Sequence, residues 1–173
     1  MKLTIVINGM GGVGKDTLCQ FAAERYLTRN VSSITPIKEL AERCGWKGEK
    51  TDRARKFLSD LKALTVAYSD YPTVYLTGEY KAFLDSDEEL MFVHIREPEE
   101  IEKFVKATGG AAVTLLIRGG DRFGRAGKQY GNASDDGVEN YPYDYVFTND
   151  KPLAETEGAF LSFLAKIISE KAQ

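Results

Sequence analysis

The stretch Gly9–Thr17, G-M-G-G-V-G-K-D-T, decides the fold of this chain. It follows a compact apolar and β-branched run, Leu3–Asn8 (L-T-I-V-I-N), which predicts a buried β-strand. After Gly14, apolar residues recur at intervals of three and four, which predicts a helix. A glycine-rich turn between a strand and a helix indicates a loop whose amides converge on a phosphate group at the positive end of the helix.

One residue departs from the usual pattern of such loops, G-x-x-x-x-G-K-[ST]. Asp16 stands where a hydroxyl normally helps to hold magnesium. A carboxylate is also a hard oxygen ligand, so Asp16 binds Mg²⁺ directly, holds one of its waters, or is a first-turn acid without a ligand. The residues expected to bind the phosphates of ATP are Gly11, Gly12, Val13, Gly14, Lys15, Asp16 and Thr17, with Asp16 and Thr17 at the Mg²⁺.

Length and composition restrict the class of protein. The 173 residues suit a single domain, and 43% apolar with 28% charged residues is ordinary for a soluble globular protein. The net charge of −3 does not indicate a nucleic-acid or membrane binder, and no run approaches the ~18 apolar residues that span a bilayer. Cys19 and Cys44 are not spaced for zinc, which indicates reduced thiols in the cytoplasm.

Apolar strands alternate with helices along the rest of the chain. This order predicts an α/β fold with a five-stranded parallel sheet between two layers of helices. The expected strands are 3–8, 31–37, 90–95, 112–117 and 145–148, and the expected helices include 51–69, 98–107 and a last one after Pro152. Residues 71–84 are ambiguous and favour a helix. Ligands bind such sheets beyond the carboxyl ends of the strands, where the glycine loop, Arg96 and Arg118 fall.

Two of the expected helices have a definite apolar face. In the helix over 51–69 the face predicted to be buried consists of Ala54, Phe57, Leu58, Leu61, Leu64 and Tyr68. In the last helix the inward residues are Leu161, Leu164, Ala165 and Ile168, and its predicted caps are Asn149, Asp150 and Pro152. Residues 118–143 have no apolar period, and so long a segment without secondary structure is usually functional or disordered.

The G-K-D-T sequence at residues 14–17 resembles that of the nucleoside monophosphate kinase superfamily, which is adenylate kinase-like. The similarity is to its deoxynucleoside monophosphate kinase and phosphomevalonate kinase branch. Other stretches similar to that family follow in the same order, at 32–41, 46–58, 92–100, 112–118 and 144–150. The resemblance implies a P-loop kinase fold in one domain. Its core would be residues 1–37, 86–118 and 144–173, with an acceptor-binding insertion at about 38–85 and a lid at about 119–143.

The resemblance also implies roles for cationic residues. Phosphoryl transfer needs positioning and charge neutralisation, and the planar fork of arginine grips phosphate oxygens in pairs. The residues expected at the donor and the transferred phosphoryl are Lys15, Arg118, Arg122 and Arg125, and those at the acceptor phosphate are Lys38, Arg55 and Arg96. The middle segment leaves open whether Arg53 or Arg55 binds the acceptor. Backbone groups of Asn149 and Asp150 are expected at the adenine edge.

The first interpretation is therefore a kinase that uses ATP and Mg²⁺ to phosphorylate a nucleoside or deoxynucleoside monophosphate. A second keeps the chemistry with another small phosphorylated acceptor, such as phosphomevalonate. A third is a nucleotide-binding protein without efficient transfer, because His94 stands where the family often has an acid. Expected partners are nucleotides rather than nucleic acid or membrane, and the protein is expected to be a monomer or homodimer.

Overall fold

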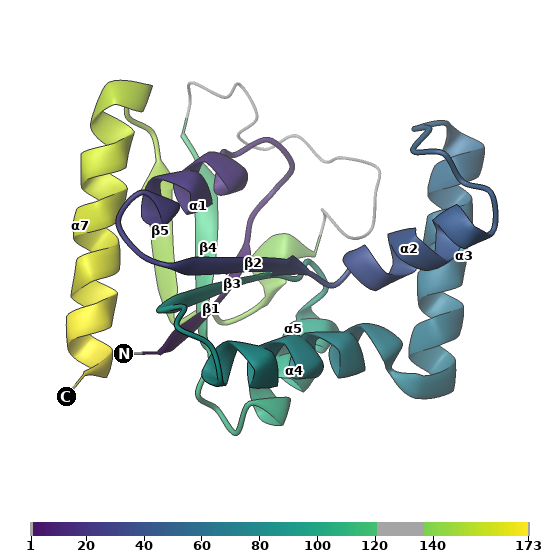
Figure 1. The fold of residues 1–173 in the computed structure, drawn as a ribbon. Coiled ribbons are helices and arrows are strands. Elements are labelled where there is room, and N and C mark those ends of the chain that lie inside the picture. The colour runs from purple at the N-terminus through teal and green to yellow at the C-terminus, as the bar shows by residue number, and fades with distance from the viewer. Residues whose placement is uncertain (1, 121–136, 173) are drawn as a thin grey trace.

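A five-stranded parallel sheet forms the centre of the computed structural model, which describes residues 2–120 and 137–172 (Figure 1). Its strands are β1 (Leu3–Asn8), β2 (Thr28–Ser32), β3 (Leu90–His94), β4 (Val113–Gly119) and β5 (Tyr145–Asn149). Their order is β2-β3-β1-β4-β5, so β1 lies between β3 and β4. The predicted class, a three-layer α/β fold, is confirmed.

Helices cover both faces of the sheet. On one face lie α1 (Lys15–Ala23) and α7 (Leu153–Lys171), and on the other α4 (Tyr71–Leu84) and α5 (Pro98–Ala107). The helices α2 (Thr35–Arg43) and α3 (Asp52–Ser69) lie to one side of these layers (Figure 1), and a short 3₁₀ helix, η2 (Val138–Asn140), precedes β5. None of the helices in the described ranges is long and apolar enough to cross a membrane.

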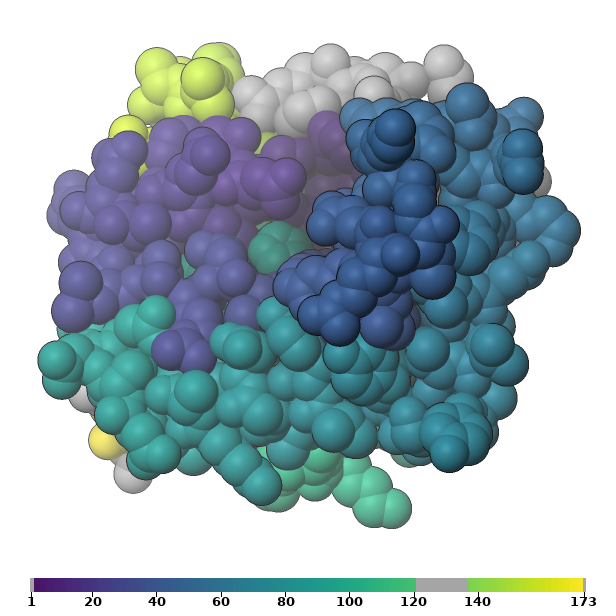
Figure 2. All heavy atoms as spheres, turned by 45° about the vertical axis from the view of Figure 1, so that its right-hand side comes forward, coloured from purple at the N-terminus to yellow at the C-terminus, as the bar shows by residue number. Residues whose placement is uncertain are grey.

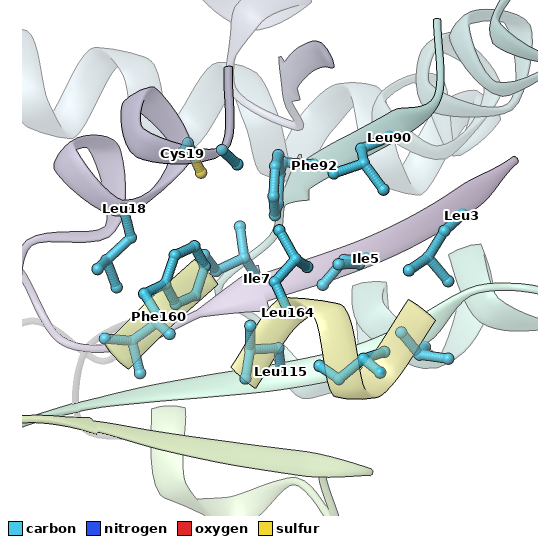
Figure 3. Packing of buried hydrophobic residues seen from close by; sticks show 14 of the residues in the cluster. Leu3, Ile5, Ile7, Leu18, Cys19, Leu90, Phe92, Leu115, Phe160 and Leu164 are labelled. Carbon is cyan, nitrogen blue, oxygen red and sulfur yellow. The ribbon is translucent and has the colours of Figure 1, made fainter. Parts of the chain in front are cut away.

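The central strand β1 contributes to two cores because successive side chains of a strand point to opposite faces. Ile5 and Ile7 pack with α1 and α7, where Leu18 and Phe160 are fully buried (Figure 3). On the other face, Val6 packs in a cluster with residues of α4 and α5. Burial on both faces explains why β1 reads as a continuous apolar run rather than an alternating one.

The second strand was predicted in the wrong place. The sequence analysis expected it at 31–37, whereas β2 spans Thr28–Ser32 and α2 begins at Thr35. β2 is an edge strand in which only Val31 is buried, so its polar residues hid it from a search for apolar runs. Pro36 lies in the first turn of α2, where a missing backbone N–H carries no cost.

The predicted apolar face of α3 is only partly buried, since Phe57, Leu58 and Leu61 are half-buried. Leu64 is 69% exposed and Tyr68 is 91% exposed, and Ala54 is the one buried residue of this helix, all of which is described. The periodicity identified the helix correctly. The burial prediction is wrong for Leu64 and Tyr68, because α3 lies beside the sheet layers, not on them (Figure 1).

The last helix turns a slightly different face inward from the one predicted. Leu164 is buried as expected, but Ala165 is exposed, and Phe160 and Ile167 fill the core instead. The N-cap of α7 is Pro152, and no side chain caps it. Capping by Asn149 and Asp150 is therefore wrong, because the amide of Asn149 turns toward the glycine loop.

The ambiguous stretch 71–84 is a helix, α4, and it belongs to the packing on the sheet. Leu76 is 2% exposed and Phe83 is fully buried, both in the same cluster as Met91 and Phe104. Of the expected insertion 38–85, the elements that lie beside the sheet layers are therefore α2 and α3 (Figure 1).

We expect Leu76→Ala on α4 to lower the free energy of unfolding by about 2–5 kcal/mol, because it leaves a cavity in the core. The matched change on α3, Leu64→Ala, removes an exposed side chain and should stay within about 0.5 kcal/mol of wild type. Urea denaturation of both variants checks this. Equal losses in the two would contradict the assignment of α4 to the core.

Candidate functional site

The glycine loop, which follows β1, packs closely against neighbouring segments. Gly9 has φ of 151°, and a Cβ there would lie 2.5 Å from the carbonyl oxygen of Ile117 in β4. Gly14 has φ of 93°, and a Cβ there would lie 2.7 Å from Nδ2 of Asn149. At both positions a side chain would collide with another group. The positive φ at both positions also favours glycine over other residues. The loop therefore takes a turn that only these glycines allow.

The side chain of Lys15 folds back across the loop. Its Nζ donates hydrogen bonds to the carbonyl oxygens of Gly9, at 2.5 Å, and of Met10, at 2.9 Å. Lys15 is also the first residue of α1, where free amides and the helix dipole favour an anion. An ammonium group and a helix N-terminus thus lie on the same short loop, which is the arrangement that binds a polyphosphate.

The residues proposed for magnesium offer oxygen atoms only. Asp16 is exposed in the first turn of α1, and Thr17 beside it is half-buried. Over the described residues, no group of three or more His, Cys, Asp and Glu side chains could hold a metal. The donors fit Mg²⁺, a hard cation that keeps several waters and takes one or two carboxylates with the phosphates of its nucleotide.

His94, the one histidine of the chain, lies half-buried at the end of β3. Its Nε2 is 3.9 Å from Sγ of Cys19 on α1. Burial lowers the pKa of His94 below its ordinary 6.5, Asp16 opposes this shift, and Lys15 adds to it. Burial, aided by Asp16, raises the pKa of the Cys19 thiol to about 12. Both side chains are therefore neutral near pH 7, so His94 supplies no charge at this position.

The register of the sheet places two of the predicted arginines beside the start of the loop. His94 pairs with Ile7, and Leu116 pairs with Asn8, so Arg96 and Arg118, each two residues further on, come level with the start of the loop. Arg96 is exposed. Arg122 and Arg125 lie outside the described residues.

The guanidinium of Arg118 forms an ion pair with the carboxylate of Glu139. Its Nε lies 3.1 and 3.2 Å from the two carboxylate oxygens of Glu139, and its Nη2 lies 2.7 Å from Oε2. Hydrogen bonding to Glu139 raises the pKa of Arg118. Both side chains are about half exposed, so the pair contributes little to stability. Glu139 was not identified from the sequence, and its spacing gave no signal.

The residues predicted for the acceptor lie on α2 and α3. Lys38 on α2 is exposed, as are Arg53 and Arg55 on α3. Nη1 of Arg55 is 3.8 Å from Oδ1 of Asp52, a weak contact, and its side chain is 71% exposed. Both arginines thus remain candidates. Figure 2 shows the surface hollowed between the purple amino-terminal segment, which carries the loop and α1, and the blue α2.

Asn149 supports the loop with its side chain. It is 3% exposed, its Nδ2 donates to the carbonyl oxygen of Val13 at 3.0 Å, and its Oδ1 accepts from Oγ1 of Thr156 at 3.3 Å. Asp150, next in sequence, is exposed. A pocket of about 270 Å³ opens beside them, lined by Phe147, Thr148, Asn149, Lys151, Thr156, Ala159 and Phe163.

No protein-family model matches the chain, and no curated protein matches it either. Solved structures do. Dephospho-CoA kinase from Campylobacter jejuni superimposes with a TM-score of 0.57 at 14% identity, covering 96% of this chain and 98% of that one. The tunicamycin resistance protein of Deinococcus radiodurans gives a TM-score of 0.59 at 14% identity, covering 96% of each chain.

A sugar kinase from Janibacter sp. HTCC2649 is similar as well, with a TM-score of 0.55 at 15% identity over 95% of each chain. At such identities the likeness concerns the fold alone. The chain shares the α/β fold of these solved structures.

The single imidazole makes the electrostatics of the site measurable. We expect the Cε1–H resonance of His94 to titrate with a midpoint below 6.5 in the folded protein, and near 6.5 in urea. The unfolded state then binds more protons than the folded one as the pH falls below 6.5, so this histidine lowers stability there. His94→Gln should lose less stability between pH 7.5 and pH 5. A folded midpoint at or above 6.5 would contradict the burial of the ring.

Proposed function

We propose that this chain is an ATP-dependent phosphotransferase that moves the γ-phosphoryl group of Mg-ATP to a nucleoside or deoxynucleoside monophosphate. The observation that carries the proposal is the glycine loop, with the ammonium of Lys15 on its first carbonyls and α1 directly behind it. Amides, a helix N-terminus and a lysine together suit a triphosphate. The fold shared with solved kinases supports the same class of chemistry.

On the donor side, the backbone amides of residues 11–14 hold phosphate oxygens and Lys15 neutralises their charge. Asp16 and Thr17 hold Mg²⁺ directly or through its waters. When bound, Mg-ATP supplies an electrophilic phosphoryl group whose charge the metal partly neutralises. The backbone of Asn149 and Asp150 borders the adenine, with the pocket between β5 and α7 beside it.

On the acceptor side, Arg96 comes level with the start of the loop, while Lys38 and Arg55 approach from α2 and α3. A monophosphate acceptor is already an anion, so no general base is required. Arg118, with Arg122 and Arg125, stabilises the transferred phosphoryl group. To do so Arg118 exchanges the carboxylate of Glu139 for phosphate oxygens, which costs little because the pair is half exposed.

Two other functions use the same residues. The cationic set would serve phosphomevalonate or another small phosphorylated acceptor equally well. A nucleotide-binding protein without efficient transfer is the second candidate, and the neutral His94 near Asp16 is the observation that favours it. The cytoplasmic location and the monomeric or homodimeric state stay predictions.

The test is ADP formation from Mg-ATP against a panel of ribo- and deoxynucleoside monophosphates, with phosphomevalonate included. We expect turnover with one acceptor. Lys15→Ala should lower kcat/KM roughly 100-fold or more, because it removes a charge that the transition state needs, and Arg118→Ala should act in the same direction. Lys166→Ala, an exposed lysine of α7, is the control and should leave turnover unchanged.

ATP binding without turnover on the whole panel would favour the second candidate. Turnover that survives Lys15→Ala undiminished would contradict the assignment of the loop as the donor site.

A further inference from the structure

The side chain of Asn8 joins three separate segments at the carboxyl edge of the sheet. It is fully buried at the end of β1. Its Oδ1 accepts the backbone N–H of Gly9 at 2.8 Å, and its Nδ2 donates to the carbonyl oxygen of Arg96 at 3.0 Å and to the hydroxyl of Tyr143 at 2.7 Å. One amide thus contacts the start of the glycine loop, the residue proposed for the acceptor phosphate, and the segment before β5.

The hydroxyl of Tyr143 continues this chain of hydrogen bonds. It accepts from Asn8 and donates to the carbonyl oxygen of Val138 at 2.7 Å. Its ring packs edge-to-face against Tyr141, with centroids 5.1 Å apart. Burial raises the pKa of Tyr143 to about 12, so the hydroxyl keeps its proton and can donate throughout the physiological range.

The last group in this series of hydrogen bonds, the carbonyl of Val138, lies one residue before the partner of Arg118. Val138 is buried at the start of η2, and the following residue, Glu139, carries the carboxylate that grips the guanidinium of Arg118. The position of η2 therefore determines where the carboxylate of Glu139 holds the guanidinium of Arg118 before Arg118 exchanges it for phosphate oxygens. The bonds through Asn8 and Tyr143 connect that position to the glycine loop and to the backbone of Arg96.

We propose that Asn8 and Tyr143 are positioning residues that couple η2, and with it Arg118, to the glycine loop and Arg96. The catalytic part of this proposal rests on the proposed function, whereas the physical coupling does not. Phosphoryl transfer requires donor and acceptor cations at fixed relative positions, and a misplacement of 1 Å costs on the order of 100-fold in rate. A buried, satisfied amide is well suited to fix them, because its bonds are directional and costly to leave unmade.

Tyr143→Phe tests the coupling, because it removes the hydroxyl and keeps the ring. We expect kcat to fall roughly 10- to 100-fold, with the Kd for Mg-ATP and the KM for the acceptor within about twofold of wild type. Tyr141→Phe, which removes a hydroxyl from the neighbouring ring and keeps the ring contact, is the matched control and should stay within about twofold in kcat. A Tyr143→Phe enzyme as active as Tyr141→Phe would overturn the proposal.

A double-mutant cycle separates positioning from general structural loss. If Tyr143 acts through Arg118, adding Tyr143→Phe to Arg118→Ala should lower kcat by less than about twofold further. A full additional loss in that background would overturn the assignment.

Hydrogen exchange gives a readout that does not depend on activity. We expect Tyr143→Phe to speed amide exchange at residues 9–14 and 138–143, and to leave α7 unchanged as a measure of global stability. Unchanged exchange at the loop would overturn the coupling. Faster exchange in a protein that turns over no acceptor would support the coupling and contradict the proposed function.

Discussion

The close approach of Gly9 to the backbone of β4 is the constraint on which the site depends. The chain must leave the central strand and enter α1 within a few residues, and there is no room for a side chain between the loop and the carbonyl of Ile117. Held in this way, the loop brings the ammonium of Lys15 over its own first carbonyls and directs the start of α1 at the same place. Asn149 supports the loop through its hydrogen bond to the carbonyl oxygen of Val13.

Much of the fold could be predicted because its signals are local. Three signals each lie within a short segment of the sequence and predicted the correct element: the apolar run of β1, the glycine pattern, and the helical periodicity of α3. β2 escaped because it is an edge strand with polar residues. The burial of α3 could not be predicted, because periodicity identifies an apolar face and says nothing about what covers it.

The site was predictable only in part, for the same reason. Lys15 and the glycines form a contiguous motif. The bond from Asn8 to Tyr143 joins residues 135 positions apart, and the bond from Asn149 to Val13 spans 136. No local sequence pattern predicts such pairs, because only the fold brings the two residues together. Asp16 lay within the motif, and its exposed carboxylate in the first turn of α1 keeps it as a candidate for the metal.

The most direct test of this account is calorimetric binding of Mg-ATP to wild type and to Gly14→Ala, with Gly158→Ala as control. Gly158 lies on α7 where an added Cβ meets nothing within 4 Å, whereas at Gly14 it meets Asn149. We predict that wild type and Gly158→Ala bind Mg-ATP with similar Kd, and that Gly14→Ala binds at least about tenfold more weakly, a change of about 1.4 kcal/mol, while remaining folded. Equal binding by all three proteins, or none by wild type, would contradict the loop as a triphosphate site.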